Sequence, residues 1–195
     1  MPLTINDYVL LILLIVSVVF DLTTKKIPNI ITFPVMIWGL VSYTIFNGLE
    51  GLLFSLSGLG LGIAFLIIPF AIGGIGGGDV KLLGAVGALK GAEFVLIATL
   101  YTAICGAIMA FGYLIIKGKL LNTLKKALKM LARMVIPVIA ARLKNPAFNQ
   151  YAAKMTSFSE EEKKDQPLSF AYGLAIAAGT VIAMTDYGRQ FLSVL

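Results

Sequence analysis

The sequence has no histidine and a single cysteine, Cys105, and only 13% of its 195 residues are charged. Without histidine or a second cysteine, the chain has no means of forming a Cys/His zinc site, an internal disulfide, or a Ser-His or Cys-His catalytic pair. We therefore expect no metal and no cofactor. Cys105 lies in an apolar run, where we expect a small packing residue. Nothing in the sequence predicts a nucleic-acid partner.

What the sequence does contain is apolar: 58% of its residues are hydrophobic, and the mean hydropathy is +0.93. This composition predicts an all-α polytopic membrane protein with about six transmembrane helices, folded as a single domain over residues 1–195. The fourth apolar segment is shorter than the roughly 17 to 25 residues of a simple span. We expect it to begin within the membrane, shielded by protein. The segments are 7–22, 30–46, 52–72, 80–89, 94–116 and 168–187.

The lysines and arginines are distributed unevenly between the two ends of these segments. An external N-terminus would place Lys25, Lys26, Lys81 and a cytoplasmic insert at 117–166 on the cytoplasmic side of the plasma membrane. Within the insert, apolar residues of 119–143 recur every three or four positions, with basic residues on the other faces. This pattern predicts an amphipathic interfacial helix, and the basic segment 117–144 would bind anionic lipid headgroups.

Two acidic residues, Asp21 and Asp79, lie at the cytoplasmic ends of their predicted spans. Ionisable residues at such places are expensive and are candidates for function. Taken alone, Asp79 could be a helix N-cap, and Asp21 could be a topogenic or pore-lining acid. The orientation brings both to the same face and depth, which favours a joint role.

A pair of aspartates can hydrolyse a peptide bond when one is ionised and the other is protonated. The ionised carboxylate takes a proton from the attacking water, and the other donates to the scissile carbonyl. Asp79 follows a glycine-rich run, and Gly76, Gly77 and Gly78 could adopt positive φ and allow close backbone approach. We expect this loop to pair with an extended substrate strand and to bring Asp79 toward Asp21. The pattern therefore favours an aspartyl protease at the membrane surface.

Three motifs resemble those of the type IV prepilin peptidases. Asp21 followed by Ile27-Pro28-Asn29 is similar to the first motif, and Gly76-Gly77-Gly78-Asp79-Val80-Lys81-Leu82 is similar to the Gly-x-Gly-Asp signature. The stretch from Tyr172 to Ala177 is similar to a Pro-Tyr/Phe-Gly-x-x-x-Ala pattern, although four residues separate Pro167 from Tyr172.

The resemblance implies that Asp21 and Asp79 are the catalytic pair and that prepilins are the substrates, cut at the cytoplasmic membrane face. It also implies that Pro28, Asn29 and Lys81 belong to the site. Lys81 could keep Asp79 ionised or extend to the membrane interface. With one cysteine, the chain resembles the short branch that lacks N-methyltransferase activity and serves tight-adherence (Flp-type) pili or archaeal filaments.

Two other classes of function compete with this reading. A small proton- or cation-coupled transporter or channel subunit would use Asp21 and Asp79 as a relay, with acids near the bilayer midplane. A non-enzymatic pilus assembly factor would tolerate Asp→Asn at both positions.

The small residues Gly58 and Gly62, and Gly87 and Gly91, are spaced for close helix packing rather than for catalysis.

Overall fold

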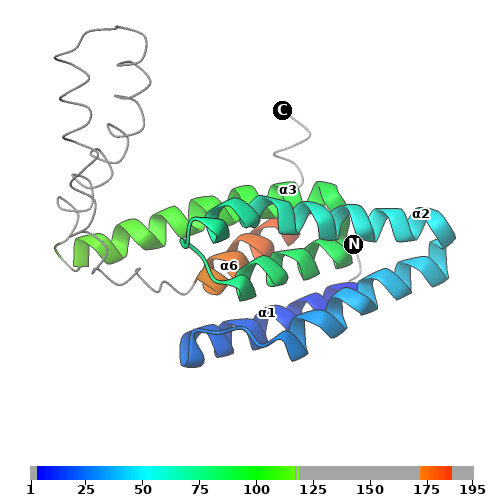
Figure 1. Cartoon of the computed structure of the whole chain (residues 1–195), viewed down its shortest axis with the longest axis horizontal. Coiled ribbons are helices and arrows are strands. Elements are labelled where there is room, and N and C mark those ends of the chain that lie inside the picture. Colours follow the sequence, from blue (N-terminus) through cyan, green and yellow to red (C-terminus); the bar gives the residue numbers. More distant parts are fainter. Residues whose placement is uncertain (1–3, 117, 119–171, 186–195) are drawn as a thin grey trace, which may run out of the picture. The chain divides into compact units, whose positions relative to one another are not determined.

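The computed structural model describes residues 4–116, 118 and 172–185, and that part of the chain is helical without strands. The predicted all-α class is confirmed. The interfacial helix expected over 119–143, most of the insert and Pro167 lie outside the described residues. Residues 4–109 and 172–185 belong to one compact unit, which holds both aspartates and their surroundings. The described helices are α1 (Ile5–Thr24), α2 (Asn29–Ala71), α3 (Gly77–Ile116), whose last seven residues lie outside this unit, and α6 (Tyr172–Met184) (Figure 1).

Three of these helices, α1, α2 and α3, are long and apolar enough to cross a membrane. With 43 and 40 residues, α2 and α3 would each extend about 60 Å if straight, twice the roughly 30 Å of a hydrocarbon core. Neither is straight, since the backbone is non-helical at Gly48 (φ 60°) and Gly91 (φ 81°). Each helix folds back on itself (Figure 1). Both breaks fall between predicted spans, while the count of six spans stays a prediction.

The first half of α3 forms the centre of the unit. Its side chains are buried from Asp79 to Leu89, with the sole exception of Lys81, which is partly buried. By contrast, α1 and α2 expose large apolar side chains on their outer faces, as at Ile12 and Ile37. Exposed apolar faces suit contact with lipid, and a helix apolar on all sides suits a protein interior. The expectation that this short segment is shielded by protein is thereby confirmed.

Glycines bring α2 into backbone contact with α3. A Cβ atom added to Gly39 would lie 2.6 Å from the carbonyl oxygen of Ala88, and one added to Gly58 would lie 2.8 Å from the backbone carbon of Gly91. Gly62 and Gly87 are equally confined by the backbone of the facing helix. The packing role predicted for Gly58, Gly62, Gly87 and Gly91 is therefore confirmed, and Gly39 shares it.

Polar contacts join the helices at the end of the unit where α1 begins. Asp7 in the first turn of α1 forms an ion pair with Lys90, which precedes the break in α3, and both side chains are largely buried. The Ser55 hydroxyl donates to the carbonyl of Ala88 at 2.7 Å. These bonds fix α1, α2 and the middle of α3 to one another.

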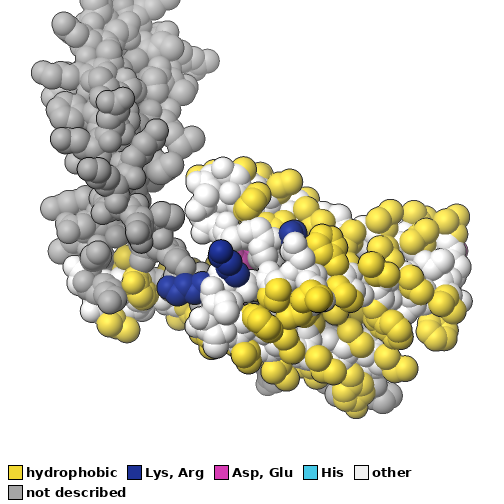
Figure 2. Space-filling model, turned by 60° about the horizontal axis from the view of Figure 1, so that its bottom comes forward, with side chains coloured by type: hydrophobic (Ala, Val, Ile, Leu, Met, Phe, Trp, Pro, Cys, Tyr) yellow, Lys and Arg dark blue, Asp and Glu magenta, His cyan; other side chains and the backbone are white. Residues whose placement is uncertain are grey.

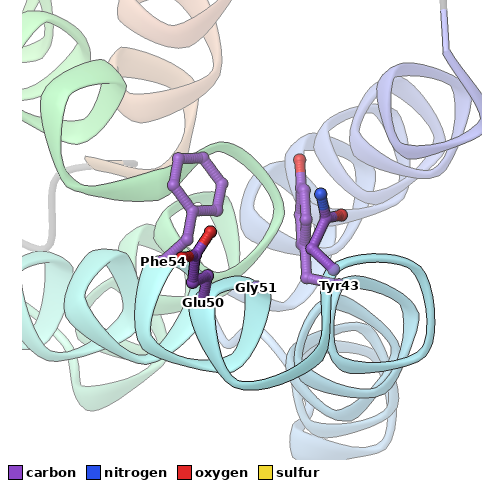
Figure 3. A pocket seen from close by; sticks show the side chains of 5 residues that line it. Tyr43, Glu50, Gly51 and Phe54 are labelled. Atoms are coloured by element: carbon purple, nitrogen blue, oxygen red, sulfur yellow. The ribbon is translucent and has the colours of Figure 1, made fainter.

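A pocket of about 360 Å³ lies beside the reversal of α2 (Figure 3). The Tyr43 hydroxyl donates to the carbonyl of Leu89 at 2.9 Å, and the Tyr43 and Phe54 rings lie 4.9 Å apart. Leu89 is about 15 Å along α3 from Asp79 at 1.5 Å per residue, so this pocket is separate from the aspartates. Its lining residues are Tyr43, Asn47, Glu50, Gly51 and Phe54.

Candidate active site

Asp21 lies in the last turn of α1, which ends at Thr24. Lys25 adopts the left-handed conformation (φ 53°, ψ 27°), and its N–H donates to the Asp21 carbonyl at 3.2 Å. A left-handed residue at this position is a common helix stop, although glycine usually fills it. The chain then passes through Ile27 to Pro28, whose extended backbone begins α2. The Asp21 side chain is only 5% exposed.

Asp79 lies in the first turn of α3, where its side chain and backbone both bond to Gly76. The Gly76 N–H donates to Asp79 Oδ2 at 3.1 Å, and the Asp79 N–H donates to the Gly76 carbonyl at 3.1 Å. An acid at the third helical position commonly bonds the helix start in this way. Asp79 is 7% exposed. Asp79 therefore stabilises the start of its own helix from a buried position. It does so from the third helical position, whereas the alternative made it the N-cap residue.

The fold brings the two carboxylates together from different helices. Asp79 lies close enough to Asp21 for an electrostatic interaction between them. Within the described part of the chain, Asp21 Oδ2 is buried and has no hydrogen-bond partner. Both acids lie near helix ends, whereas a relay in a transporter would place them near the midplane.

The start of α6 completes the surroundings of the pair. A Cβ atom added to Gly173 would lie 2.7 Å from Asp21 Oδ2, and the amides of Gly173 and Leu174 face the Asp21 carboxylate. Tyr172 lies within electrostatic range of Asp79. The sequence motif around Tyr172 pointed to this segment, but Tyr172 and Gly173 were not predicted as site residues.

The glycine loop differs from its prediction in backbone conformation. Positive φ occurs at Gly73 (80°) and not at Gly76, Gly77 or Gly78, so these three glycines do not use that freedom in this structure. Gly77 and Gly78 belong to the first turn of α3, where they do not form an extended strand. Close backbone approach does occur at Gly78: an added Cβ would lie 3.0 Å from the Cβ of Ile27. The glycine lets the second motif pack on the first.

Lys81 bonds to the first motif. Its ammonium donates to Asn29 Oδ1 at 2.8 Å and lies 5.3 Å from the centre of the Phe33 ring. Asn29 is the first residue of α2, directly after Pro28. The predicted residues Pro28, Asn29 and Lys81 therefore lie together, beside the helix turn that carries Asp79.

Comparison with known proteins identifies the family. A search of curated proteins and a search of solved structures each gave no significant match. The model of the type IV leader peptidase family matches residues 8–111, which include Asp21 and Asp79. The matched region covers more than half of the chain and contains most of α1, all of α2 and most of α3. On this evidence the chain belongs to the type IV leader peptidase family.

Proposed function

We propose that this protein is an intramembrane aspartyl endopeptidase that removes leader peptides from type IV-like prepilins, with Asp21 and Asp79 as its catalytic pair. Membership of the family makes the chain a peptidase of the leader-peptidase type. The observation that carries the assignment is that two buried carboxylates, from α1 and α3, lie within electrostatic range of each other, one of them with an oxygen that lacks a partner among the described residues.

The pair would share one proton, because two adjacent carboxylates do not both ionise cheaply. The ionised carboxylate takes a proton from water, and the water oxygen bonds to the scissile carbonyl carbon. The protonated partner gives its proton to the carbonyl oxygen, forming a tetrahedral diol. When the diol collapses, the C–N bond breaks and a carboxyl proton passes to the leaving amine, while one diol hydroxyl becomes the new carbonyl oxygen and returns its proton to the ionised carboxylate. The pair ends with one proton, as it began.

The charges around the site support cleavage at the cytoplasmic face. Lys25 and Lys26 follow Asp21, and Lys81 follows Asp79 by two positions. Figure 2 shows lysine side chains clustered around a point where an acidic side chain is visible, beside a largely apolar surface. Basic residues collect on the cytoplasmic side of membrane proteins. This orientation places the N-terminus outside the plasma membrane and the pair at the depth where a prepilin leader meets its hydrophobic helix.

The same orientation gives the topology and the partners of the enzyme. The reversals at Gly48 and Gly91 would be external turns, which divides α2 and α3 into two spans each and gives six spans with α1 and α6. The insert at 117–166 would lie on anionic headgroups through its basic segment 117–144. With a single cysteine, the chain would act as a peptidase without N-methyltransferase activity.

Cleavage of a prepilin by the purified protein in detergent tests the function directly. We expect Asp21→Asn and Asp79→Asn each to lower the cleavage rate by at least about 10³-fold. The double variant should be no worse than either single one, because each removes an essential half of the same machinery. Glu93→Gln, which makes the same chemical change at an exposed position, is the matched control and should cleave normally.

Melting temperatures of the same variants in detergent separate loss of catalysis from loss of fold. We expect the variants to melt within a few degrees of the parent protein. Substantial cleavage by either single variant would refute the aspartyl mechanism. An inactive parent protein would refute the proposed substrate class.

A further inference from the structure

We propose that Lys81 and Asn29 form a positioning pair, whose hydrogen bond holds the helix turn carrying Asp79 against the segment that follows Asp21. This inference rests on the proposed function, since it concerns the separation of the two catalytic carboxylates. It gives Lys81 and Asn29 a role within the protein rather than in contact with the substrate.

The two motifs touch at two successive points. At the first, Gly78 lies against Ile27, where an added Cβ would be 3.2 Å from both the backbone nitrogen and the backbone oxygen. At the second, Lys81 donates to Asn29 at 2.8 Å. Asp79 lies between Gly78 and Lys81 in the sequence. The turn that carries this carboxylate is therefore held on both sides by the same short segment.

The Lys81 ammonium has two partners on α2, the Asn29 side chain and the Phe33 ring. A hydrogen bond from an ammonium is shorter and stronger than one between neutral groups. The Phe33 ring lies 5.3 Å from the ammonium and adds a favourable cation–π interaction from the first turns of α2. Asn29 and Phe33 are four residues apart, so they present both partners on one face of α2. Lys81 is thus oriented toward α2 rather than toward Asp79.

The consequence for catalysis follows from the position of Asp21. Asp21 is connected to Asn29 through the short link that contains Lys25 and Ile27, and Asp79 is connected to Lys81 within one helical turn. Loss of the bond would remove one of the two contacts described above between these segments. The carboxylates would then sample separations unsuited to sharing a proton, and a misplacement of about 1 Å costs about 10²-fold in rate.

The test is a pair of substitutions that remove the bond from either side, Lys81→Met and Asn29→Leu. We expect each to lower kcat by about 10- to 100-fold with KM changed less than about threefold. The double variant should match the worse single variant. Asn29→Asp keeps the acceptor and should retain most activity. Lys26→Met removes an exposed lysine from the same link and is the matched control, with kcat unchanged.

Two results would overturn the positioning role. A rise in KM with additive losses in the double variant would show that Lys81 and Asn29 contact the substrate separately. Unchanged kcat in both single variants would show that the bond is dispensable.

A readout without substrate keeps this inference separate from the proposed function. If the bond forms, the melting-temperature losses of Lys81→Met and Asn29→Leu should be less than additive in the double variant. Additive losses refute the pair even if the parent protein does not cleave prepilins. Non-additive losses in an inactive parent would support the bond and refute the function instead.

Discussion

Replacing Gly78 with alanine should reduce catalysis more than it reduces stability. The new Cβ would lie 3.0 Å from the Ile27 Cβ and 3.2 Å from the Ile27 backbone nitrogen and oxygen, which is tighter than ordinary contact at 3.4–4 Å. The neighbours must therefore move by a few tenths of an ångström. Overpacking of this kind costs about 1–3 kcal/mol, and alanine recovers roughly 1 kcal/mol through its helix propensity. The net loss of stability is about 0–2 kcal/mol.

The displaced residue precedes Asp79, so the movement reaches the carboxylate directly. We expect Gly78→Ala to lower kcat by about 10-fold and Gly78→Val, which adds two methyl groups at the same contact, to lower it further. The assay is cleavage of a prepilin, with melting temperature measured on the same samples.

Gly60→Ala is the matched control, because a Cβ at Gly60 meets nothing within 4 Å and lies in a helix. It should leave activity unchanged and raise stability by up to about 1 kcal/mol. Full activity of Gly78→Val would refute the role of Gly78 in positioning Asp79. A proportional fall of activity and stability across the series would refute it as well. Proportional losses would mean that Gly78 serves helix packing alone.

Three further predictions concern Lys90, Lys25 and Lys26 in the same unit. Lys90→Met removes the cationic partner of the buried Asp7 carboxylate, which keeps only its bonds from Thr4, and should lower stability by about 3 kcal/mol, measured as melting temperature; an unchanged melting temperature would contradict a buried ion pair. Lys25→Gly relieves a left-handed backbone and should raise stability by about 1 kcal/mol, and a lower melting temperature would argue against that conformation. A cysteine introduced at Lys26 in a Cys105→Ser background should react with an impermeant reagent only from the cytoplasmic side, and labelling from outside would reverse the orientation.

Much of the fold follows from local features of the sequence. Apolar runs long enough to cross a bilayer predict helices, and Gly58 and Gly62 predict a close helix contact because a pair four residues apart shares one face. The segment of 80–89 is apolar apart from Lys81 and too short for a simple span, which correctly indicated that it is shielded by protein. Asp21 and Asp79 stood out because carboxylates are rare in such runs, and the fold does bring them together.

The features of the site that the sequence did not predict depend on contacts between residues far apart in the chain. Lys81 is one turn from Asp79 in the sequence, but its partner is Asn29, which only the packing of α2 on α3 brings near. Gly173 carries no side chain that could signal chemistry, and its importance comes from the Asp21 oxygen beside it. Gly76, Gly77 and Gly78 looked alike, yet the positive φ is at Gly73, and α3 begins earlier than the loop suggested.

The central position of the first half of α3 gives the surrounding lipid unequal access to the two aspartates. Asp21 is carried by α1, whose outer face exposes Ile12, Ile15 and Val19, whereas Asp79 is carried by a helix enclosed by protein. A bilayer whose thickness changes can tilt or shift α1 directly, and it reaches the α3 segment only through its neighbours. Acyl-chain length in reconstituted vesicles should therefore tune the cleavage rate by altering the relative depth of the two carboxylates, so membrane composition would act on this enzyme as a physical regulator.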